Sequence, residues 1–318
     1  MKVKLILKGI GTYIPGIAAL RAKGSGGTGS ARYCYSVWLR HLVMAHRNGL
    51  CQKPPRTILE LGPGDSLGIG LSALLTGAEK YYGLDVIQHT AIEKNLAVLD
   101  ELVALFRSEE DIPGEKEFPR VRPVLDSYDF PSHILTRDDL ARLLDERRIE
   151  HIQRSIRTMH EPGSMLRYLT NTPDSETIPR ESVDMIFSQA VLEYVEPLPD
   201  TYRLMNLWLQ PEGFVSHQID FSCHGLAEDW NGHWSYSDLQ WKLIRGKRVS
   251  CITRAPHSAH IRSLEQVGFR VVCDLKVQGA ATKSERRLAP RFADLSVQDR
   301  TTRGTFIQAV KRNGVGST

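Results

Sequence analysis

Cysteine is scarce in this chain, and no two cysteines stand close together. The five are dispersed, at Cys34, Cys51, Cys223, Cys251 and Cys273. Without a Cys-x-x-Cys pair, the sequence offers neither a zinc knuckle nor a thioredoxin-type redox site. An odd, scattered set is typical of reduced thiols, so we expect a cytoplasmic protein.

Long apolar runs are missing as well. The first twenty residues contain apolar stretches, but Lys8, Pro15 and several glycines interrupt them. A signal peptide needs an unbroken apolar core, and a membrane span needs about 20 apolar residues. We therefore expect no signal peptide and no transmembrane segment.

The chain also lacks a strong charge imbalance. The formal net charge of its 318 residues is +4, and Lys and Arg are mixed with Asp and Glu along the sequence. A dedicated nucleic-acid-binding protein usually gathers its basic residues in a stripe, so we expect no nucleic-acid partner. The length suits one large domain with elaborations, or two small ones.

What the sequence does contain is an alternation of apolar strands and amphipathic helices. Strands are predicted at residues 57–61, 81–86, 165–169, 183–188, 213–221, 269–275 and 305–310. Helices are predicted at 33–45, 67–76, 91–106, 201–209 and 257–266. This order predicts an α/β fold built on a doubly wound, seven-stranded, mainly parallel sheet.

The same pattern suggests how the chain is divided. We predict an N-terminal arm and helix at 1–55, a main domain at 56–311 and a tail at 312–318. Within the main domain we expect a helical insertion at about 111–160 and a His/Trp-rich cap at about 222–256. The Gly/Ser-rich stretch 23–31 lacks the Gly-Lys-Ser/Thr ending of a phosphate-binding loop, so we interpret it as a flexible lid or linker.

The first candidate site is the turn after the first strand. Glu60 lies near the end of this strand, and Gly62 and Gly64 follow with one residue between them. Gly62 allows a sharp turn, Gly64 allows a ligand to touch the backbone, and the next helix should offer free amide groups at its N-terminus. Asp85 ends the next strand, where its carboxylate can accept hydrogen bonds from the hydroxyls of an adenosine ribose.

Two cofactors use such a turn, and the charges distinguish them. A dinucleotide site needs a third glycine at position 67, but Leu67 stands there and Gly68 comes one place late. Asp65 in the turn would also repel a pyrophosphate. A methionine tail with its ammonium group and sulfonium tolerates acids, and Glu60 suits the ammonium, so the charges favour S-adenosyl-L-methionine over NAD.

From residue 56 to about residue 311, the chain resembles the class I S-adenosylmethionine-dependent methyltransferases, in particular their type 11-like members. The resemblance is carried by ILELGPGDS, YYGLDV, ESVDMIFSQAVLEYVEPL, LWLQPEGFVSHQIDF and HSAHIRSLEQVGFRVV, in that order. Ser66 departs from the family pattern by replacing a third glycine, and Tyr194 by replacing a histidine. The adenine-side residue stays open between Asn171 and Asp174.

The resemblance and the turn together imply a set of cofactor-binding residues. They are Glu60, Gly62, Pro63, Gly64, Ser66, Asp85 and Val86, with Ser188 and Gln189 at the end of the fourth strand. The last two lie at the sheet edge where open α/β sheets bind ligands. They could equally be helix-cap residues.

Histidines and aromatics gather after the fifth strand. His217, with Asp220 or His224 as alternatives, is a candidate base for an acceptor hydroxyl, since neutral histidine accepts protons near neutral pH. Expected acceptor contacts are Glu193, Trp230, His233, Trp234 and Tyr236, although each histidine and aromatic could instead be packing. The histidine and acid spacing matches no standard metal signature, so we expect no metal site.

The sequence therefore predicts an S-adenosylmethionine-dependent methyltransferase acting on a hydroxyl of a small-molecule or glycan acceptor. Two alternatives stay open. One is an NAD(P)-dependent oxidoreductase, and the other is a non-catalytic scaffold that binds S-adenosylmethionine.

Overall fold

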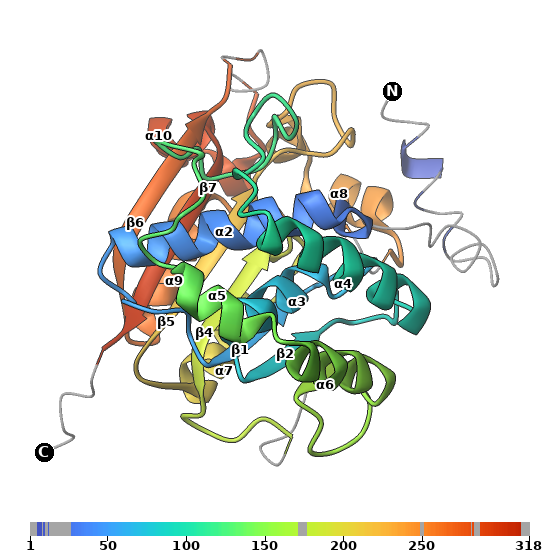
Figure 1. Ribbon diagram of the computed structural model, residues 1–318. Helices are drawn as coiled ribbons and strands as arrows, with labels where there is room; N and C mark the ends of the chain where they lie inside the picture. Colours follow the sequence, from blue (N-terminus) through green and yellow to red (C-terminus); the bar gives the residue numbers. More distant parts are fainter. Residues whose placement is uncertain are drawn as a thin grey trace, which may run out of the picture.

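A seven-stranded sheet forms the centre of the protein (Figure 1). The computed structural model describes residues 5–7, 9, 12, 27–170, 177–248, 251–280, 282 and 287–312. The strands are β1 (Thr57–Leu61), β2 (Lys80–Leu84), β3 (Leu166–Leu169), β4 (Val183–Gln189), β5 (Leu209–Asp220), β6 (Phe269–Gln278) and β7 (Thr302–Lys311).

The strand order across the sheet is β3-β2-β1-β4-β5-β7-β6. Strands β1 to β5 pair in parallel, whereas β7 runs antiparallel to both β5 and β6. The predicted fold class, a doubly wound and mainly parallel α/β sheet, is therefore confirmed. The chain has a Rossmann-like α/β fold with one reversed strand, β7.

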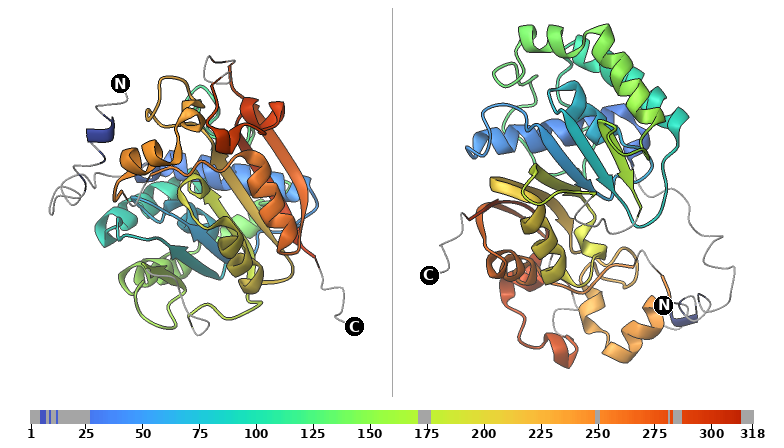
Figure 2. Two further views of the ribbon diagram at one scale, coloured as in Figure 1. Left: turned by 180° about the vertical axis from the view of Figure 1, so that it is seen from behind. Right: turned by 90° about the horizontal axis from the view of Figure 1, so that it is seen from below.

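Helices cover both faces of the sheet, as the right-hand view of Figure 2 shows. One layer contains α2 (Ala31–Arg47), α3 (Gly68–Leu75), α4 (Ile92–Arg107), α5 (Arg137–Leu143) and α6 (Glu146–Arg157). The other contains α7 (Leu198–Trp208) and α9 (His257–Gln266). Side chains alternate along a strand, so Ile58 packs into the α2 layer while Leu59 and Leu61 pack into the α7 layer. This alternation determines which of the site residues can face a ligand.

The predicted insertion is helical only in its second half. Residues 108–136 form turns without a helix, and α5 and α6 follow them. The side chain of Arg40 holds the first half against α2, because it donates to the backbone oxygens of Pro113 (3.0 Å) and Pro123 (2.6 Å). Arg40 itself is fully buried, which the amphipathic pattern of this helix did not predict.

The cap after β5 contains a helix that sequence analysis missed. Helix α8 (Asp238–Arg245) begins at a capping box in which Ser237 and Gln240 bond each other's backbone. A 3-10 turn, η5 (Gly232–Ser235), precedes it, and α10 (Val297–Thr301) lies before β7. Leu5 from the N-terminal arm packs into the same apolar cluster as α8.

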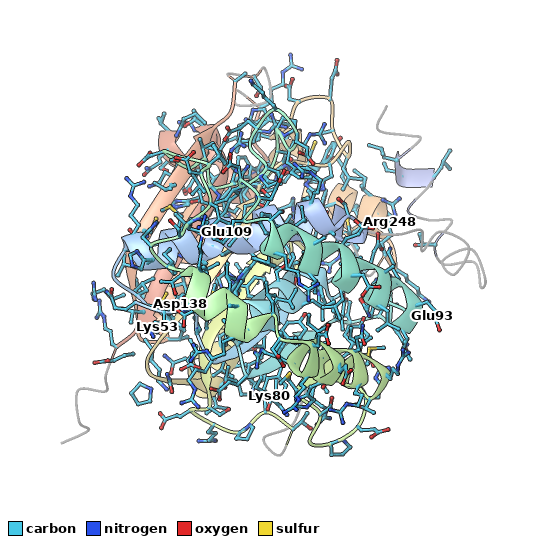
Figure 3. All side chains as sticks on the ribbon, in the orientation of Figure 1. Lys53, Lys80, Glu93, Glu109, Asp138 and Arg248 are labelled. Atoms are coloured by element: carbon cyan, nitrogen blue, oxygen red, sulfur yellow. The ribbon has the colours of Figure 1, made fainter. Side chains whose placement is uncertain are left out.

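Charged side chains of both signs lie around the outside of the molecule, and Lys53, Lys80 and Glu93 stand well apart in Figure 3. Among the described residues, no helix is both long enough and apolar enough to cross a membrane.

Candidate functional site

The turn after β1 needs glycine. Gly62 and Gly64 have φ angles of +64° and +74°, a region that side chains other than glycine rarely adopt. A Cβ atom on Gly62 would lie 2.6 Å from Cγ2 of Val191, so the loop after β4 packs directly against the turn. The turn is also tied to β2, since the amide of Gly62 donates to the backbone oxygen of Leu84 at 2.8 Å.

Asp85 stands beside this turn, at the end of β2. Its Oδ2 accepts a 3.3 Å hydrogen bond from the amide of Gly64, and its Oδ1 accepts one of 2.7 Å from the amide of Val86. Neighbouring Val86 is exposed. The carboxylate is thus held at the carboxyl edge of the sheet, next to the glycine turn.

Glu60 lies beneath the turn, on the α2 side of β1. Its side chain is buried, and the hydroxyl of Tyr81 donates to its Oε2 at 2.6 Å. Burial raises the pKa of Glu60 to about 8, which the Tyr81 hydrogen bond offsets only in part and the charge of Asp85 raises further. A cation placed near this carboxyl would draw off its proton.

The sequence predicted free amide groups at the N-terminus of α3, but three of these amides have hydrogen-bond partners. The amide of Ser66 donates to Thr28 Oγ1 (3.2 Å), that of Leu67 to Asn95 Oδ1 (2.8 Å) and that of Gly68 to Ser66 Oγ (3.1 Å). Side chains of the protein therefore already occupy these amides, and none of the three is available for an anion. The expectation was wrong for these three amides: two partners come from other elements, and the third is the Ser66 side chain in the same turn.

The end of the Gly/Ser-rich stretch is fixed rather than flexible. Residues Gly27–Gly29 form a 3-10 turn, η3, and Thr28 within it is buried. The Ser66 hydroxyl donates to the backbone oxygen of Thr28, so η3 is attached to the cofactor turn. The side chain of Ser66, predicted to contact the cofactor, is thereby bonded to the protein, while residues 23–26 lie outside the described part of the chain.

Ser188 and Gln189 lie on opposite faces of the sheet. Ser188 is buried on the α7 side, where its hydroxyl pairs with His217 Nδ1 at 2.8 Å. Gln189 lies on the α2 side, where its Oε1 is 3.2 Å from His41 Nε2. Of the two, only Gln189 is partly exposed.

His217 is not placed to take a proton from an acceptor. It has no exposed surface and lies beneath Tyr202 of α7, and burial lowers its pKa to about 3. Its Nε2 has no hydrogen-bond partner among the described residues. The preferred candidate for the base was therefore wrong, because residue 217 falls on the strand face that α7 and α9 cover.

The two alternatives, Asp220 and His224, form a pair at the carboxyl end of β5. His224 Nε2 lies 3.3 Å from Asp220 Oδ2, and His224 Nδ1 lies 2.8 Å from the hydroxyl of Tyr194. Burial raises the pKa of Asp220, but hydrogen bonds from His224 and Ser222 outweigh it and lower the pKa to about 2. Asp220 is therefore ionised, and about a third of each side chain of the pair is exposed.

Tyr194 and Tyr33 are site residues that sequence analysis did not identify. The hydroxyl of Tyr194 lies 2.8 Å from Nδ1 of His224. Tyr33 lies on the first turn of α2, and burial raises its pKa well above the ordinary value, which a hydrogen bond with Gln189 offsets only in part. Its hydroxyl therefore lies close to the carboxyl end of β4. No local pattern marks Tyr33, because its helix is apolar on several sides.

The aromatic residues of the cap are mainly packing. Trp234 and Tyr236 are buried, and they donate to the backbone oxygens of Arg254 (3.1 Å) and Leu226 (2.9 Å). Trp230 is partly exposed, but its indole nitrogen donates to the backbone oxygen of Ala280 at 2.9 Å. The expectation that Trp234 and Tyr236 touch an acceptor was wrong, because their faces and polar atoms are used within the cap.

Glu193 and His233 face a small recess instead. The recess lies between η4 (Leu192–Tyr194), the end of β5 and the cap, and it is too small to hold a water molecule. Both carboxyl oxygens of Glu193 and Nδ1 of His233 are buried without a hydrogen-bond partner among the described residues. Two of the predicted acceptor contacts thus meet at one place.

The adenine-side alternatives and the possible metal ligands complete the description of the site. Asn171 and Asp174, the alternatives for the adenine side, lie outside the described residues. Within the described part of the chain, no group of three or more His, Cys, Asp or Glu side chains could hold a metal ion.

No family model and no curated protein matches the chain. The solved structures that it matches are mostly S-adenosylmethionine-dependent methyltransferases. One, from Mesorhizobium loti, is 15% identical with a TM-score of 0.40 over 85% of this chain and 98% of that one. A putative sarcosine dimethylglycine methyltransferase from Galdieria sulphuraria is 11% identical with a TM-score of 0.43, over 86% and 85%.

A third match is Haemonchus contortus phosphoethanolamine N-methyltransferase 2, solved with phosphomonomethylethanolamine and S-adenosylhomocysteine. It is 12% identical with a TM-score of 0.41, over 87% of this chain and 53% of that one. Similarity at this level does not establish what this chain binds or which reaction it catalyses.

Proposed function

We propose that this protein is an S-adenosylmethionine-dependent methyltransferase that methylates a hydroxyl group of a small-molecule or glycan acceptor. One observation carries the proposal: the loop after β4 contacts both the glycine turn and the Asp220–His224 pair. Val191 packs against Gly62, and three residues later Tyr194 bonds His224. The loop after β4 thus joins a nucleoside-type site to a proton-accepting pair.

The residues at the turn fit the cofactor. Asp85 stands where it can accept hydrogen bonds from two ribose hydroxyls, and exposed Val86 is free to lie against the adenine. Buried Glu60 provides a carboxyl for the ammonium group. Bound S-adenosylmethionine would supply a methyl group on a positively charged sulfur, ready for in-line transfer.

The structure weighs against a dinucleotide at the same turn. A pyrophosphate needs free amides at the helix N-terminus, and those of Ser66, Leu67 and Gly68 are occupied. Gly68 is required for helix packing rather than for a pyrophosphate. A Cβ atom there would lie 2.5 Å from Cys34 Sγ and 2.9 Å from Val98 Cγ1. It lets α3 pack against α2 and α4.

The Asp220–His224 pair gives the histidine a defined orientation. Ionised Asp220 favours the tautomer with a proton on Nε2 of His224, which leaves Nδ1 as the proton acceptor. The hydroxyl of Tyr194 pairs with this nitrogen, so an acceptor hydroxyl would have to displace Tyr194 or pass its proton through the Tyr194 hydroxyl. We assign His224 as the base for the acceptor hydroxyl and Asp220 as the residue that positions it.

Methyl transfer to an extract of the source cells tests the function. We expect the protein to move an isotope-labelled methyl group from S-adenosylmethionine onto a compound of low molecular weight. The label should survive mild alkali, as a methyl ether does and a methyl ester does not. Label in nucleic acid would contradict the acceptor class, and tight cofactor binding without any transfer would favour the scaffold alternative.

A further inference from the structure

The Asp220–His224 pair continues into a third side chain, that of Tyr194. Nε2 of His224 lies 3.3 Å from Asp220 Oδ2, and Nδ1 of the same ring lies 2.8 Å from the hydroxyl of Tyr194. The rings of Tyr194 and His224 meet edge to face, with their centroids 5.7 Å apart and their planes at 83°. Both imidazole nitrogens therefore have partners, so the end of this chain that can meet an acceptor hydroxyl is Tyr194.

The direction of the hydrogen bonds follows from the charge of Asp220. Its Oδ1 accepts from the amide (2.8 Å) and the hydroxyl (2.6 Å) of Ser222, and its ionised carboxylate can only accept. In the neutral ring of His224, Nε2 therefore carries the proton and Nδ1 accepts. The hydroxyl of Tyr194 then donates to Nδ1, which leaves the lone pairs of its oxygen for another donor.

Tyr194 is held on the loop that contacts the cofactor turn. Its element, η4, follows Val191, which packs against Gly62. The backbone oxygen of Glu193 accepts from the amide of Thr253 at 2.6 Å, so the cap fixes η4 as well. Tyr194 is partly exposed, and its hydrogen bond with His224 lies at the exposed surface. An acceptor can therefore reach the Tyr194 hydroxyl from solvent.

The backbone of His224 has a strained conformation. Its φ angle is +47°, in the left-handed region that residues with a side chain rarely adopt. Such strain persists where the surrounding contacts hold it, and it is concentrated at functional sites. The contacts with Asp220 and Tyr194 hold the imidazole here, so the strained residue and the hydrogen-bonded chain coincide.

The Tyr194 hydroxyl keeps its own proton before the reaction. Burial raises the pKa of Tyr194, and the charges of Glu193 and Asp220 raise it further, so the phenol is neutral near neutral pH. A neutral phenol is a poor base by itself, but it can take up one proton while it gives another to His224.

Building on the proposed function, we propose that Tyr194 contacts the acceptor hydroxyl directly and relays its proton to His224. As the acceptor oxygen bonds to the methyl carbon, the bond from this carbon to sulfur breaks, and its electron pair stays on sulfur as a neutral thioether. The acceptor proton passes to the Tyr194 oxygen, and the Tyr194 proton passes to Nδ1 of His224. The carboxylate of Asp220 then faces an imidazolium ion, which it stabilises.

The tautomer of His224 tests the relay without turnover. In the nitrogen NMR spectrum of the full chain, the variant His224→Gln identifies the His224 signals among those of 11 histidines. We expect a proton on Nε2 and none on Nδ1 of the neutral ring, and a shifted Nδ1 signal in Tyr194→Phe. A proton on Nδ1 would overturn the relay even if Tyr194→Phe does not fold.

Turnover of the acceptor identified in the cell extract is the second measurement. Tyr194→Phe should lower kcat by roughly 100-fold or more, with the affinity for S-adenosylhomocysteine intact. Adding His224→Gln should lower kcat by no more than about threefold beyond the more impaired single variant, because residues that act as one unit are not additive. Full turnover in folded Tyr194→Phe, or losses that multiply in the double variant, would overturn the relay.

Tyr202→Phe is the matched control. It removes a hydroxyl from another tyrosine–histidine pair, in which the Tyr202 hydroxyl lies 3.0 Å from Nδ1 of His260. That pair is fully buried between α7 and α9, so turnover should not change. No methyl transfer by the unaltered protein would refute the proposed function and the relay with it, whereas a proton on Nδ1 of His224 would refute the relay alone.

Discussion

Glu60 allows the cofactor site to be tested by counting protons. Burial raises its pKa from the ordinary 4.5 to about 8, so about 0.9 of the Glu60 carboxyls carry a proton at pH 7. The ammonium of the cofactor, placed beside this carboxyl, should drive the proton off. Binding of S-adenosylhomocysteine at pH 7 should therefore release close to one proton per protein.

Calorimetry in buffers with different ionisation enthalpies measures this release directly. Glu60→Gln keeps the hydrogen bond from Tyr81, has no proton to lose, and should show a release near zero. Glu101→Gln, at an exposed position on α4, is the control and should behave as the unaltered protein. No proton release from the unaltered protein, or equal release from Glu60→Gln, would refute the placement of the ammonium beside Glu60.

The same shift makes the stability of the cofactor-free protein depend on pH. The folded state keeps the Glu60 proton between pH 4.5 and about 8, whereas the unfolded state loses it above about pH 4.5. Stability is therefore lost as pH rises through this window, by up to roughly 3 kcal/mol at pH 7. Glu60→Gln should remove this part of the pH dependence, and a melting series that leaves it intact would contradict the burial argument.

Three further predictions concern the turn and the base. Asp85→Ala should weaken S-adenosylhomocysteine binding by about 1–3 kcal/mol in calorimetry, since it removes hydrogen bonds from a charged group; an unchanged dissociation constant would exclude Asp85 from the ribose. Gly62→Ala should lower the melting temperature more than Gly163→Ala does. Both residues have positive φ, but a Cβ atom meets Val191 at position 62 and nothing within 4 Å at position 163, so equal losses would show that the clash is relieved. His224→Gln should lower kcat by roughly 100- to 10,000-fold with cofactor affinity intact, and His151→Gln, an exposed histidine, should not; full turnover in His224→Gln would remove it as the base.

Sequence periodicity predicted the elements of the sheet and its layers well. The strand at 57–61 and the helix at 257–266 have the same bounds in the structure, because each is a short apolar pattern with clear ends. The glycine turn also matched, since positive φ at Gly62 and Gly64 is a local property of the backbone.

Which face of a strand meets a ligand could not be predicted in the same way. Alternation places His217 opposite Gln218 and Asp220, but only the packing of α7 and α9, from distant parts of the chain, buries the His217 face. The helix amides of Ser66 and Leu67 raise the same difficulty, because their partners Thr28 and Asn95 lie far away in sequence. Contacts of this kind leave no local signature.

The cap shows that amino-acid composition alone does not identify a binding site. Its histidines and aromatics suggested an acceptor site, yet Trp234 and Tyr236 form the interior of the cap. Small caps need large aromatic side chains to bury enough apolar surface. A cluster of aromatic residues in the sequence therefore does not distinguish packing residues from ligand-binding residues. Glu193 and His233 differ from these aromatics in having buried polar atoms without a partner among the described residues, a difference that is visible only in three dimensions.

Titration calorimetry with S-adenosylhomocysteine and with NAD tests the central claim most directly. The account predicts a dissociation constant on the order of micromolar for S-adenosylhomocysteine and no detectable heat with NAD, because side chains occupy the amides that a pyrophosphate needs. Tight binding of NAD without binding of S-adenosylhomocysteine would contradict it.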